Sequence, residues 1–303
     1  MMLTKVAVGV DLGGTNLALG LVDQSGKIIA EQSTPITNRG SWAVPRLIGK
    51  QVNQLVSANN VEVFGVGCGL PGLVDCETGK VHQSPHFPDW QDLPISELLA
   101  AQLDWPTVID NDANMFARGE MYHGAGKELS DFIILTLGSG IGGAVVSKRQ
   151  LFKGKSGFAG EFAHMTVASN EIKCTCGNRD CLELYASSVF FSRQAKAYHD
   201  AEKAALLARQ GDQNALQLWD QFGSSLGVGI NSLMNAFGIN TFIIAGGISK
   251  AIDLFLPQAK SEIAARAYRK HAENVQILPA KLGASAGLIG AATSAWNSTE
   301  QNL

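Results

Sequence analysis

The sequence is poor in charged residues and has no strongly basic region. Aspartate, glutamate, lysine and arginine make up 17% of its 303 residues, and the formal net charge is −3. An average chain is about one quarter charged. Nucleic-acid-binding domains normally carry a basic face, and no dense run of lysine and arginine occurs here. The composition therefore argues against a nucleic-acid partner.

Long apolar runs are also missing. No run approaches the roughly 18 residues that a membrane-spanning helix requires. The apolar stretch 6–10 is too short for the apolar region of a secretory signal peptide, and the carboxylate of Asp11 follows it directly. We therefore expect a soluble, cytoplasmic protein with no membrane partner.

Cysteine is scarce, and its number is odd, because the chain has five. Three of them are clustered at Cys174, Cys176 and Cys181. In a reducing compartment such a cluster indicates a metal before a disulfide. Cys68 lies in an apolar run, which is typical of an unpaired buried cysteine, and Cys76 has no evident partner.

Apolar residues (46%) and glycine (33 residues) are plentiful. Apolar segments with strand character lead into glycine clusters at 11–15, 138–143 and 246–247. Apolar residues at helical spacing predict helices between them. These helices are expected over residues 44–58, 95–103, 183–209, 212–237, 250–271 and 284–296. Alternating strands and helices indicate an α/β protein with a largely covered sheet.

Two half-chains share one pattern, in which an apolar strand leads to a glycine turn and a returning apolar strand. This repetition predicts two lobes around a ligand cleft. We expect a small N-terminal lobe over residues 1–115 plus 284–303, with the last helix packed back on it. The large lobe is expected over residues 116–283 and contains a candidate zinc segment, 161–183.

The glycine turns are candidate phosphate-binding sites. Small residues let backbone N–H groups approach phosphate oxygens, and the hydroxyl of Thr15 adds a donor. Asp11 could hold Mg²⁺, usually through water. Neither of the first two turns has the P-loop sequence G-x-x-x-x-G-K-[ST]. Neither fits G-x-G-x-x-G at the start of a helix, because the residues after each turn read as strand. A plain glycine hairpin is the alternative for each turn, but three turns at strand ends favour a nucleotide.

The motif Asp110–Asn114 follows a predicted strand, 107–109, and holds a candidate catalytic base. Its start imitates a calcium loop, but methionines occupy the two places where that loop needs glycine and glutamate, so we exclude calcium. Asp112 could instead cap the helix that follows. Phosphoryl transfer requires an attacking hydroxyl held in line and a carboxylate that accepts its proton. We predict that Asp112 is this carboxylate.

His164 and the three clustered cysteines form a predicted zinc site. A Cys₃His set fits a closed tetrahedral structural zinc, with no ligand position left for water. Reduced thiols or a redox pair are the alternatives. Glu161 and Glu183 flank this segment, and carboxylates commonly bind sugar hydroxyls through strong hydrogen bonds. A solvated surface charge is the usual role of a glutamate, but the position beside a metal clamp favours sugar contacts.

Together these motifs resemble the ROK family, which contains bacterial sugar kinases and sugar-responsive repressors. The resemblance runs from Asp11–Thr15 to Gly283–Gly287, and its most specific parts are Asp110–Asn114, Glu161–His164 and the clustered cysteines. It implies an α/β, two-lobed, actin-like (ribonuclease-H-like) fold that closes over ATP and sugar. Members are usually dimers or tetramers, so we expect a homodimer.

The resemblance also implies roles for individual residues. Asp112 matches the catalytic base, and Asn111 matches a sugar ligand. Glu161, His164 and Glu183 match the other sugar contacts, with His164 also bound to zinc. The residues that match nucleotide-binding positions are Asp11, Gly13, Gly14, Thr15, Gly138, Ser139, Gly140, Gly246 and Gly247.

Four positions depart from the family pattern. Ser139 stands where threonine is usual and keeps the hydroxyl. Ala163 stands where glycine is common, and Asp180 replaces a usual glycine, although aspartate tolerates left-handed backbone better than most residues. His86 stands where glucose-type members carry asparagine, in a loop near the sugar. It is therefore a candidate sugar contact that bears on substrate identity.

The sequence thus predicts a kinase that uses ATP and Mg²⁺ to phosphorylate the 6-hydroxyl of a hexose, with a structural Zn²⁺. Glucose is the expected substrate, and N-acetylglucosamine or another hexose is the alternative. Glu161 argues against N-acetylmannosamine, because kinases for that sugar resemble this sequence with histidine there. A repressor would need a DNA-binding module before the first strand, where we expect no room for one. A catalytically silent sugar sensor is the remaining alternative.

Overall fold

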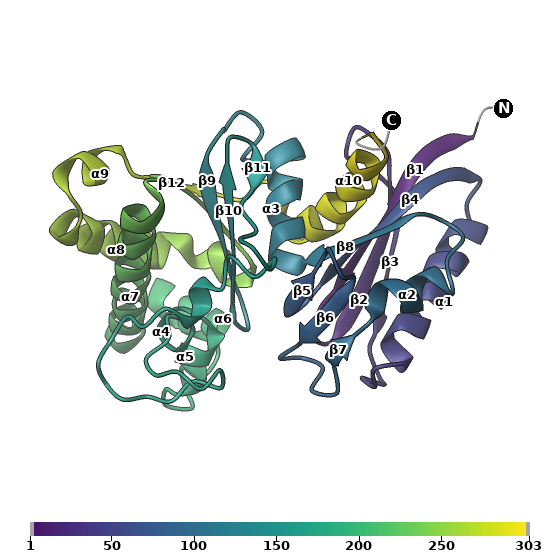
Figure 1. Ribbon diagram of the computed structural model, residues 1–303. Coiled ribbons are helices and arrows are strands. Elements are labelled where there is room, and N and C mark those ends of the chain that lie inside the picture. Colours follow the sequence, from purple (N-terminus) through teal and green to yellow (C-terminus); the bar gives the residue numbers. More distant parts are fainter. Residues whose placement is uncertain (1–2, 301–303) are drawn as a thin grey trace. The chain divides into compact units, whose positions relative to one another are not determined.

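The computed structural model describes residues 3–300, and the chain forms two compact α/β units (Figure 1). Unit 1 comprises Met1–Ser130, Arg149–Ala159 and Lys281–Leu303, and unit 2 comprises Asp131–Lys148 and Gly160–Ala280. The α/β class predicted from the sequence is confirmed.

Unit 1 is built on a five-stranded sheet with the strand order β3-β2-β1-β4-β8. The strands are β1 (Thr4–Leu12), β2 (Asn16–Val22), β3 (Ile28–Pro35), β4 (Val61–Leu70) and β8 (Thr107–Asn111). Strands β1 to β3 pair antiparallel, whereas β1, β4 and β8 run parallel. A smaller antiparallel sheet contains β5 (Leu73–Asp75), β6 (Lys80–Gln83) and β7 (Gln91–Leu93).

Alternation along β1 decides which helices cover each face of this sheet. Val6, Val8 and Val10 belong to the core that includes α1 (Ala43–Ser57) and α2 (Ile95–Ala100). Ala7 belongs instead to the core around α10 (Ala286–Glu300). Successive side chains of a strand point to opposite faces, so β1 is buried on both sides.

Helix α10 lies directly on the sheet and on α3 (Asp112–His123). A Cβ atom at Gly67 would overlap the carbonyl oxygen of Ala291, so only glycine permits this approach. The buried carboxylate of Glu120 in α3 accepts hydrogen bonds from the N–H groups of Lys281 (3.1 Å) and Leu282 (2.8 Å).

These contacts explain why the compact units divide the chain differently from the lobes expected from the sequence. The first division follows residue 130 rather than residue 115, because α3 packs with α10 inside unit 1. The segment 149–159, with the short strand β11 (Gln150–Leu151), also belongs to unit 1. The last segment begins at residue 281 rather than 284, because Glu120 holds the N–H groups of residues 281 and 282.

Unit 2 repeats the pattern of an antiparallel hairpin extended by parallel strands. The sheet strands that lie within unit 2 are, in spatial order, β10 (Ile141–Ser147), β9 (Phe132–Leu137), β12 (Thr241–Ala245) and β13 (Gln276–Pro279). Strands β9 and β10 pair antiparallel, and β9, β12 and β13 run parallel. The β2-β1-β4 part of unit 1 has the same arrangement, as the repeated sequence pattern predicted.

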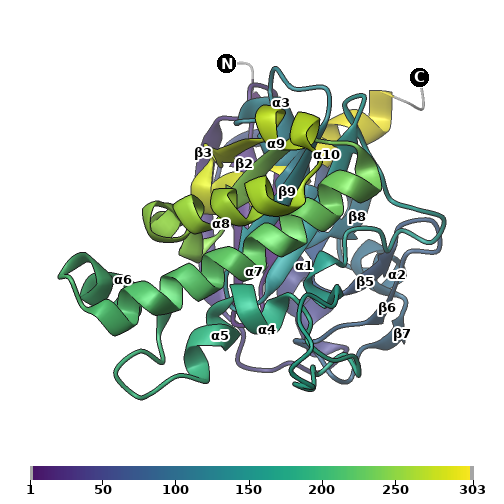
Figure 2. The same cartoon turned by 90° about the vertical axis from the view of Figure 1, so that its left-hand side faces the viewer.

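The helices of unit 2 enclose an aromatic core. Helix α7 (Gln213–Phe237) begins after Asp212, whose side chain accepts the N–H of Ala215, and ends at Gly238 in the left-handed conformation (φ 66°). It lies beside α8 (Ile252–Arg266), as Figure 2 shows. Trp219 of α7 stacks with Phe255 of α8, and the ring of Phe222 packs against Phe255 at a tilt. No helix among residues 3–300 has the length and apolar character needed to cross a bilayer.

Two of the predicted helices are wrong. The segment 183–209 forms three short helices, α4 (Glu183–Ala186), α5 (Ser188–Ser192) and α6 (Ala201–Arg209). Ser187 is extended, and its hydroxyl donates to the carbonyl of Glu183 and accepts the N–H of Val189. Such local serine bonds compete with helix continuation. The segment 250–271 likewise divides between α8 and α9 (Arg269–Asn274), after a short 3₁₀ turn at Gly247–Ala251.

Candidate functional site

The candidate base Asp112 lies at the first position of α3, directly after β8. Asn111 is the capping residue, because its side-chain oxygen accepts the N–H groups of Ala113 (2.9 Å) and Asn114 (3.3 Å). The carboxylate of Asp112 accepts the N–H of the next residue, Ala113 (2.8 Å). The alternative that Asp112 serves as the helix cap is therefore wrong, because Asn111 fills that role.

Asn111 is more constrained than a free sugar ligand would be. Its oxygen is used by the cap, and its amide nitrogen donates to the carbonyl of Gly72 at 3.0 Å. A carboxamide nitrogen has two N–H groups. One N–H group is thus left for a sugar hydroxyl, in a direction fixed by the other bonds.

The first glycine turn, residues 13–15, joins β1 to β2 and is closed by a bond from the N–H of Gly13 to the carbonyl of Asn16 (3.0 Å). The His86 ring packs against this turn. A Cβ atom at Gly14 would lie 2.9 Å from two ring atoms of His86, so a larger residue would displace the imidazole. His86 therefore lies beside the predicted phosphate turn within unit 1.

Asp11 ends the parallel part of β1 beside the start of α10. A Cβ atom at Gly287 would lie 2.7 Å from an Asp11 carboxylate oxygen. Burial raises the pKa of Asp11 to about 6. A bound cation would favour the charged form of this carboxylate, so the chemistry of Asp11 fits the predicted Mg²⁺ role.

The second glycine turn, between β9 and β10, is in contact with Glu183. The N–H of Ile141 donates to the Glu183 carboxylate at 3.2 Å, and a Cβ atom at Gly140 would overlap the same oxygen. The carbonyl of Gly138 accepts the N–H of Ser188, and Ser139 is exposed. Unit 2 thus brings the predicted sugar ligand Glu183 against the predicted phosphate turn, a contact that the sequence did not indicate.

The third glycine pair lies at the same end of the sheet of unit 2. Gly246 has a left-handed backbone (φ 84°) and lies against Leu137, the residue before the second turn. Gly247 begins the 3₁₀ turn, and the hydroxyl of Ser249 donates to the carbonyl of Gly246 (2.7 Å). The carboxyl ends of neighbouring parallel strands are the usual ligand-binding edge of an α/β sheet.

Glu161 and His164 are held against β10 by close backbone packing. Gly160 has φ 110°, and a Cβ atom there would overlap the carbonyl oxygen of Gly143. His164 Nε2 lies 3.9 Å from the Glu161 carboxylate. Burial raises the pKa of Glu161, the neighbouring His164 opposes this rise, and Glu183 adds to it. Ala163 has ordinary helical backbone, so the position does not require glycine.

The four predicted zinc ligands come together in unit 2. Their ligand atoms all lie within 4.8 Å of one another. Cys174 Sγ is 3.9 Å from His164 Nδ1, and Cys176 Sγ is 3.6 Å from Cys181 Sγ. Tetrahedral Zn–S bonds of about 2.3 Å place neighbouring sulfurs about 3.8 Å apart. The set fits a structural zinc bound through Nδ1, which leaves Nε2 directed to Glu161.

Asp180 stabilises the loop of this metal site. Its backbone is left-handed (φ 52°), as the replacement of glycine by aspartate predicted. Its buried carboxylate accepts the hydroxyl of Tyr185 (2.6 Å) and the N–H groups of Glu171 (2.8 Å) and Ile172 (3.2 Å). The loop between His164 and the cysteines is therefore held by protein contacts that do not depend on a metal.

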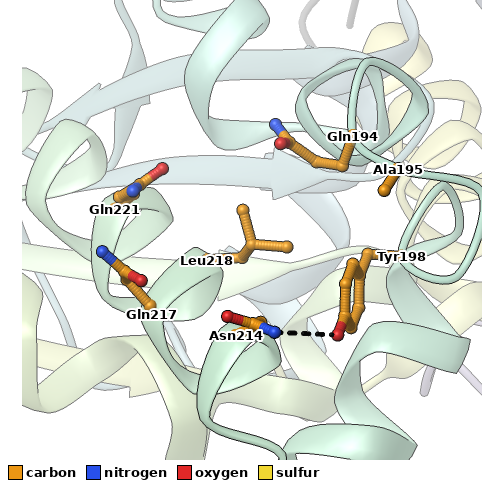
Figure 3. A pocket seen from close by; sticks show the side chains of 7 residues that line it. All are labelled: Gln194, Ala195, Tyr198, Asn214, Gln217, Leu218 and Gln221. Atoms are coloured by element: carbon orange, nitrogen blue, oxygen red, sulfur yellow. Dashed lines mark hydrogen bonds between the residues drawn. The ribbon is translucent and has the colours of Figure 1, made fainter.

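One pocket of unit 2 is lined by none of the candidate site residues. This depression of about 250 Å³ is formed by the start of α7 and the segment before α6 (Figure 3). Its lining residues are Gln194, Ala195, Tyr198, Asn214, Gln217, Leu218 and Gln221. None is a carboxylate or a cation, so this pocket has no base for phosphoryl transfer and is not the candidate site.

Comparison with known proteins agrees with this geometry. The model of the ROK family matches residues 7–297. A glucokinase of Thermotoga maritima is 33% identical over 94% of this chain and 96% of its own length. A xylose repressor of Bacillus spizizenii is 31% identical over 94% of this chain and 75% of its own.

A solved structure gives the same result for the fold. The ROK family glucokinase of Streptomyces griseus, crystallised with glucose and AMPPNP, superposes with a TM-score of 0.83 at 30% identity. The match covers 96% of this chain and 99% of that protein. The family resemblance and the actin-like fold expected from it are confirmed. This chain belongs to the ROK family.

Proposed function

We propose that this protein is an ATP-dependent hexose kinase that transfers the γ-phosphoryl group of ATP to the 6-hydroxyl of glucose. The observation that carries the proposal is the position of Asp112, a carboxylate directly after a parallel strand. The neighbouring Asn111 caps the helix, so Asp112 does not have to. Relatives named glucokinase, and one crystallised with glucose and an ATP analogue, support the same reaction.

Each group of residues has a defined task in this reaction. The oxygen of the sugar 6-hydroxyl forms a bond to the γ-phosphorus of ATP, and ADP leaves. Asp112 accepts the proton that this hydroxyl loses. Asn111, Glu161, His164 and Glu183 hold the sugar by hydrogen bonds. The glycine turns donate backbone N–H groups to ATP phosphates, and Asp11 at the end of the parallel part of β1 would hold Mg²⁺.

The metal site would act on the sugar contacts rather than on the reacting atoms. Zinc at His164 and the three cysteines supplies a rigid clamp. His164 would present Nε2 to Glu161, which lies 3.9 Å away in this structure. One zinc ligand, His164, would therefore position two predicted sugar contacts, namely itself and Glu161.

We expect glucose to give the highest kcat/KM in a coupled assay of ADP release with a panel of hexoses. N-acetylglucosamine or mannose is expected second, because His86 replaces the asparagine of glucose-type members. A site that hydrogen-bonds a substrate hydroxyl can reject analogues that lack it by about 10⁴ or more. A higher kcat/KM for N-acetylglucosamine would reject glucose as the preferred substrate but keep the kinase.

The variant His86→Asn tests whether this residue discriminates between sugars. We expect it to shift the kcat/KM ratio toward glucose, since a carboxamide is smaller than an imidazole and its hydrogen bonding does not depend on a tautomer. The control is Asp89→Asn, an exposed residue of the same loop. An unchanged ratio in His86→Asn would assign discrimination to other residues.

A sugar-binding regulator is the second candidate, because several relatives are named xylose repressors. Release of ADP by purified protein in the presence of a hexose would favour the enzyme. Sugar binding without ADP release would favour the regulator or a silent sensor. The homodimer and the cytoplasmic location remain predictions, which light scattering on the purified protein and cell fractionation would test.

A further inference from the structure

A partly buried ion pair lies directly before the candidate base. Lys153 Nζ is 2.6 Å from Asp110 Oδ2, and the side chain of Asp110 is only 3% exposed whereas that of Lys153 is 33% exposed. Asp110 lies in β8, directly before Asn111, which ends the strand and caps α3. The sequence analysis assigns no individual role to Asp110 or Lys153.

The second oxygen of Asp110 organises the loop that carries the base. It accepts the N–H of Asn111 at 2.8 Å and the side-chain amide of Asn114 at 2.9 Å. These bonds fix the peptide that leads into Asp112 and the first turn of α3 around it. One buried carboxylate thus joins the lysine to the backbone on which Asp112 is placed.

Lys153 makes a short ion pair with Asp110 and a weaker contact with a thiol. Burial alone would lower the pKa of Lys153, but the attraction of Asp110 raises it overall. Its ammonium group also donates to Cys76 Sγ at 3.5 Å. Arg149, at the start of the same segment, donates to the carbonyls of Lys127 (2.7 Å) and Met121 (3.2 Å). The segment is therefore fastened to the C-terminal end of α3 as well.

We propose that Lys153 is a positioning residue for the phosphoryl transfer. Its ammonium group neutralises and orients Asp110, and Asp110 in turn fixes the Asn111–Asp112 peptide. Without the lysine, Asp110 is a buried carboxylate without its counter-ion, and such groups rearrange or take up a proton. Rearrangement would break the bond from the N–H of Asn111 to Asp110, and protonation would weaken it. This inference rests on the proposed function, because it assigns the base role to Asp112.

The test compares Lys153→Met with Lys153→Arg. The methionine variant keeps apolar volume but removes the charge, and we expect kcat to fall about 100-fold, as for a misplaced catalytic group. The KM for sugar should rise, because Asn111 shares the loop, while the KM for ATP stays unchanged. Lys153→Arg keeps the charge and should recover kcat to within about tenfold of wild type.

Two further variants distinguish positioning from general stability. Cys76→Ala removes the other contact of Lys153 and should leave both KM values and kcat unchanged. Lys153→Met combined with Asp110→Asn removes both charges, so it should lose less activity than the product of the two single losses. A fall in kcat with both KM values unchanged in Lys153→Met would show a smaller folded fraction and would overturn the proposal.

Hydrogen exchange provides a readout that does not depend on the reaction. The amides of residues 111–114 should exchange faster in Lys153→Met than in wild type, while those of α7 stay unchanged. Unaltered exchange at residues 111–114 would overturn the positioning role. If wild-type protein phosphorylates no hexose, the proposed function fails, but this exchange difference still decides whether Lys153 orders the loop.

Discussion

The variant Asp112→Asn is expected to lower kcat by about 10²–10⁴-fold, the usual loss when a general base is removed. The substitution keeps the shape of the side chain and an oxygen for the N–H of Ala113, which lies 2.8 Å from the carboxylate. Sugar binding should therefore be largely kept. The measurements are steady-state kinetics of ADP release and sugar affinity by calorimetry.

The variant Asp253→Asn is a control for the loss of a negative charge at the start of a helix. Asp253 is also an aspartate in the first turn of a helix, in α8 of unit 2. An acidic residue in this position contributes typically about 0.3–1 kcal/mol to stability, so Asp253→Asn should lower stability slightly and leave kcat unchanged. Near-normal turnover in Asp112→Asn would remove Asp112 from the base role.

The loop Asp110–Asn114, which carries the candidate base, was only partly predictable from the sequence. The motif Asp110–Asn114 located the loop, but the sequence left open whether Asp112 caps the helix. Aspartate and asparagine are equally good caps, so composition cannot choose between positions 111 and 112. The backbone decides, because Asn111 is extended (φ −62°, ψ 145°) and its oxygen faces the N–H groups.

Contacts between distant residues were not predictable in the same way. Lys153 follows Asp110 by 43 positions, a separation with no helical or strand periodicity, so the ion pair has no local signature. The same holds for Glu120, which binds the N–H groups of residues 281 and 282 and thereby sets the extent of unit 1. The three helices within 183–209 were missed because Ser187 fits a helical pattern yet bonds locally.

The zinc ligands, by contrast, were predictable because three of the four lie within eight residues and their chemistry has few alternatives. Cys176→Ala should abolish stoichiometric zinc binding and activity while the chain stays folded. Structural zinc contributes about 10–16 kcal/mol of apparent binding free energy in small peptides that have no other core. Unit 2 has its own core around Trp219 and Phe222, so the loss should be local to residues 161–183.

The local loss should appear first in sugar binding. Without the metal, His164 loses the bond that holds Nδ1, and Nε2 no longer faces Glu161, so the KM for sugar should rise sharply. Elemental analysis measures the zinc content, far-ultraviolet circular dichroism the folding of the chain, and sugar titration the sugar affinity. Cys76→Ala is the control, since that thiol lies in unit 1 and should keep one zinc per chain. Freshly purified wild-type protein without zinc, or full sugar affinity in Cys176→Ala, would contradict the clamp.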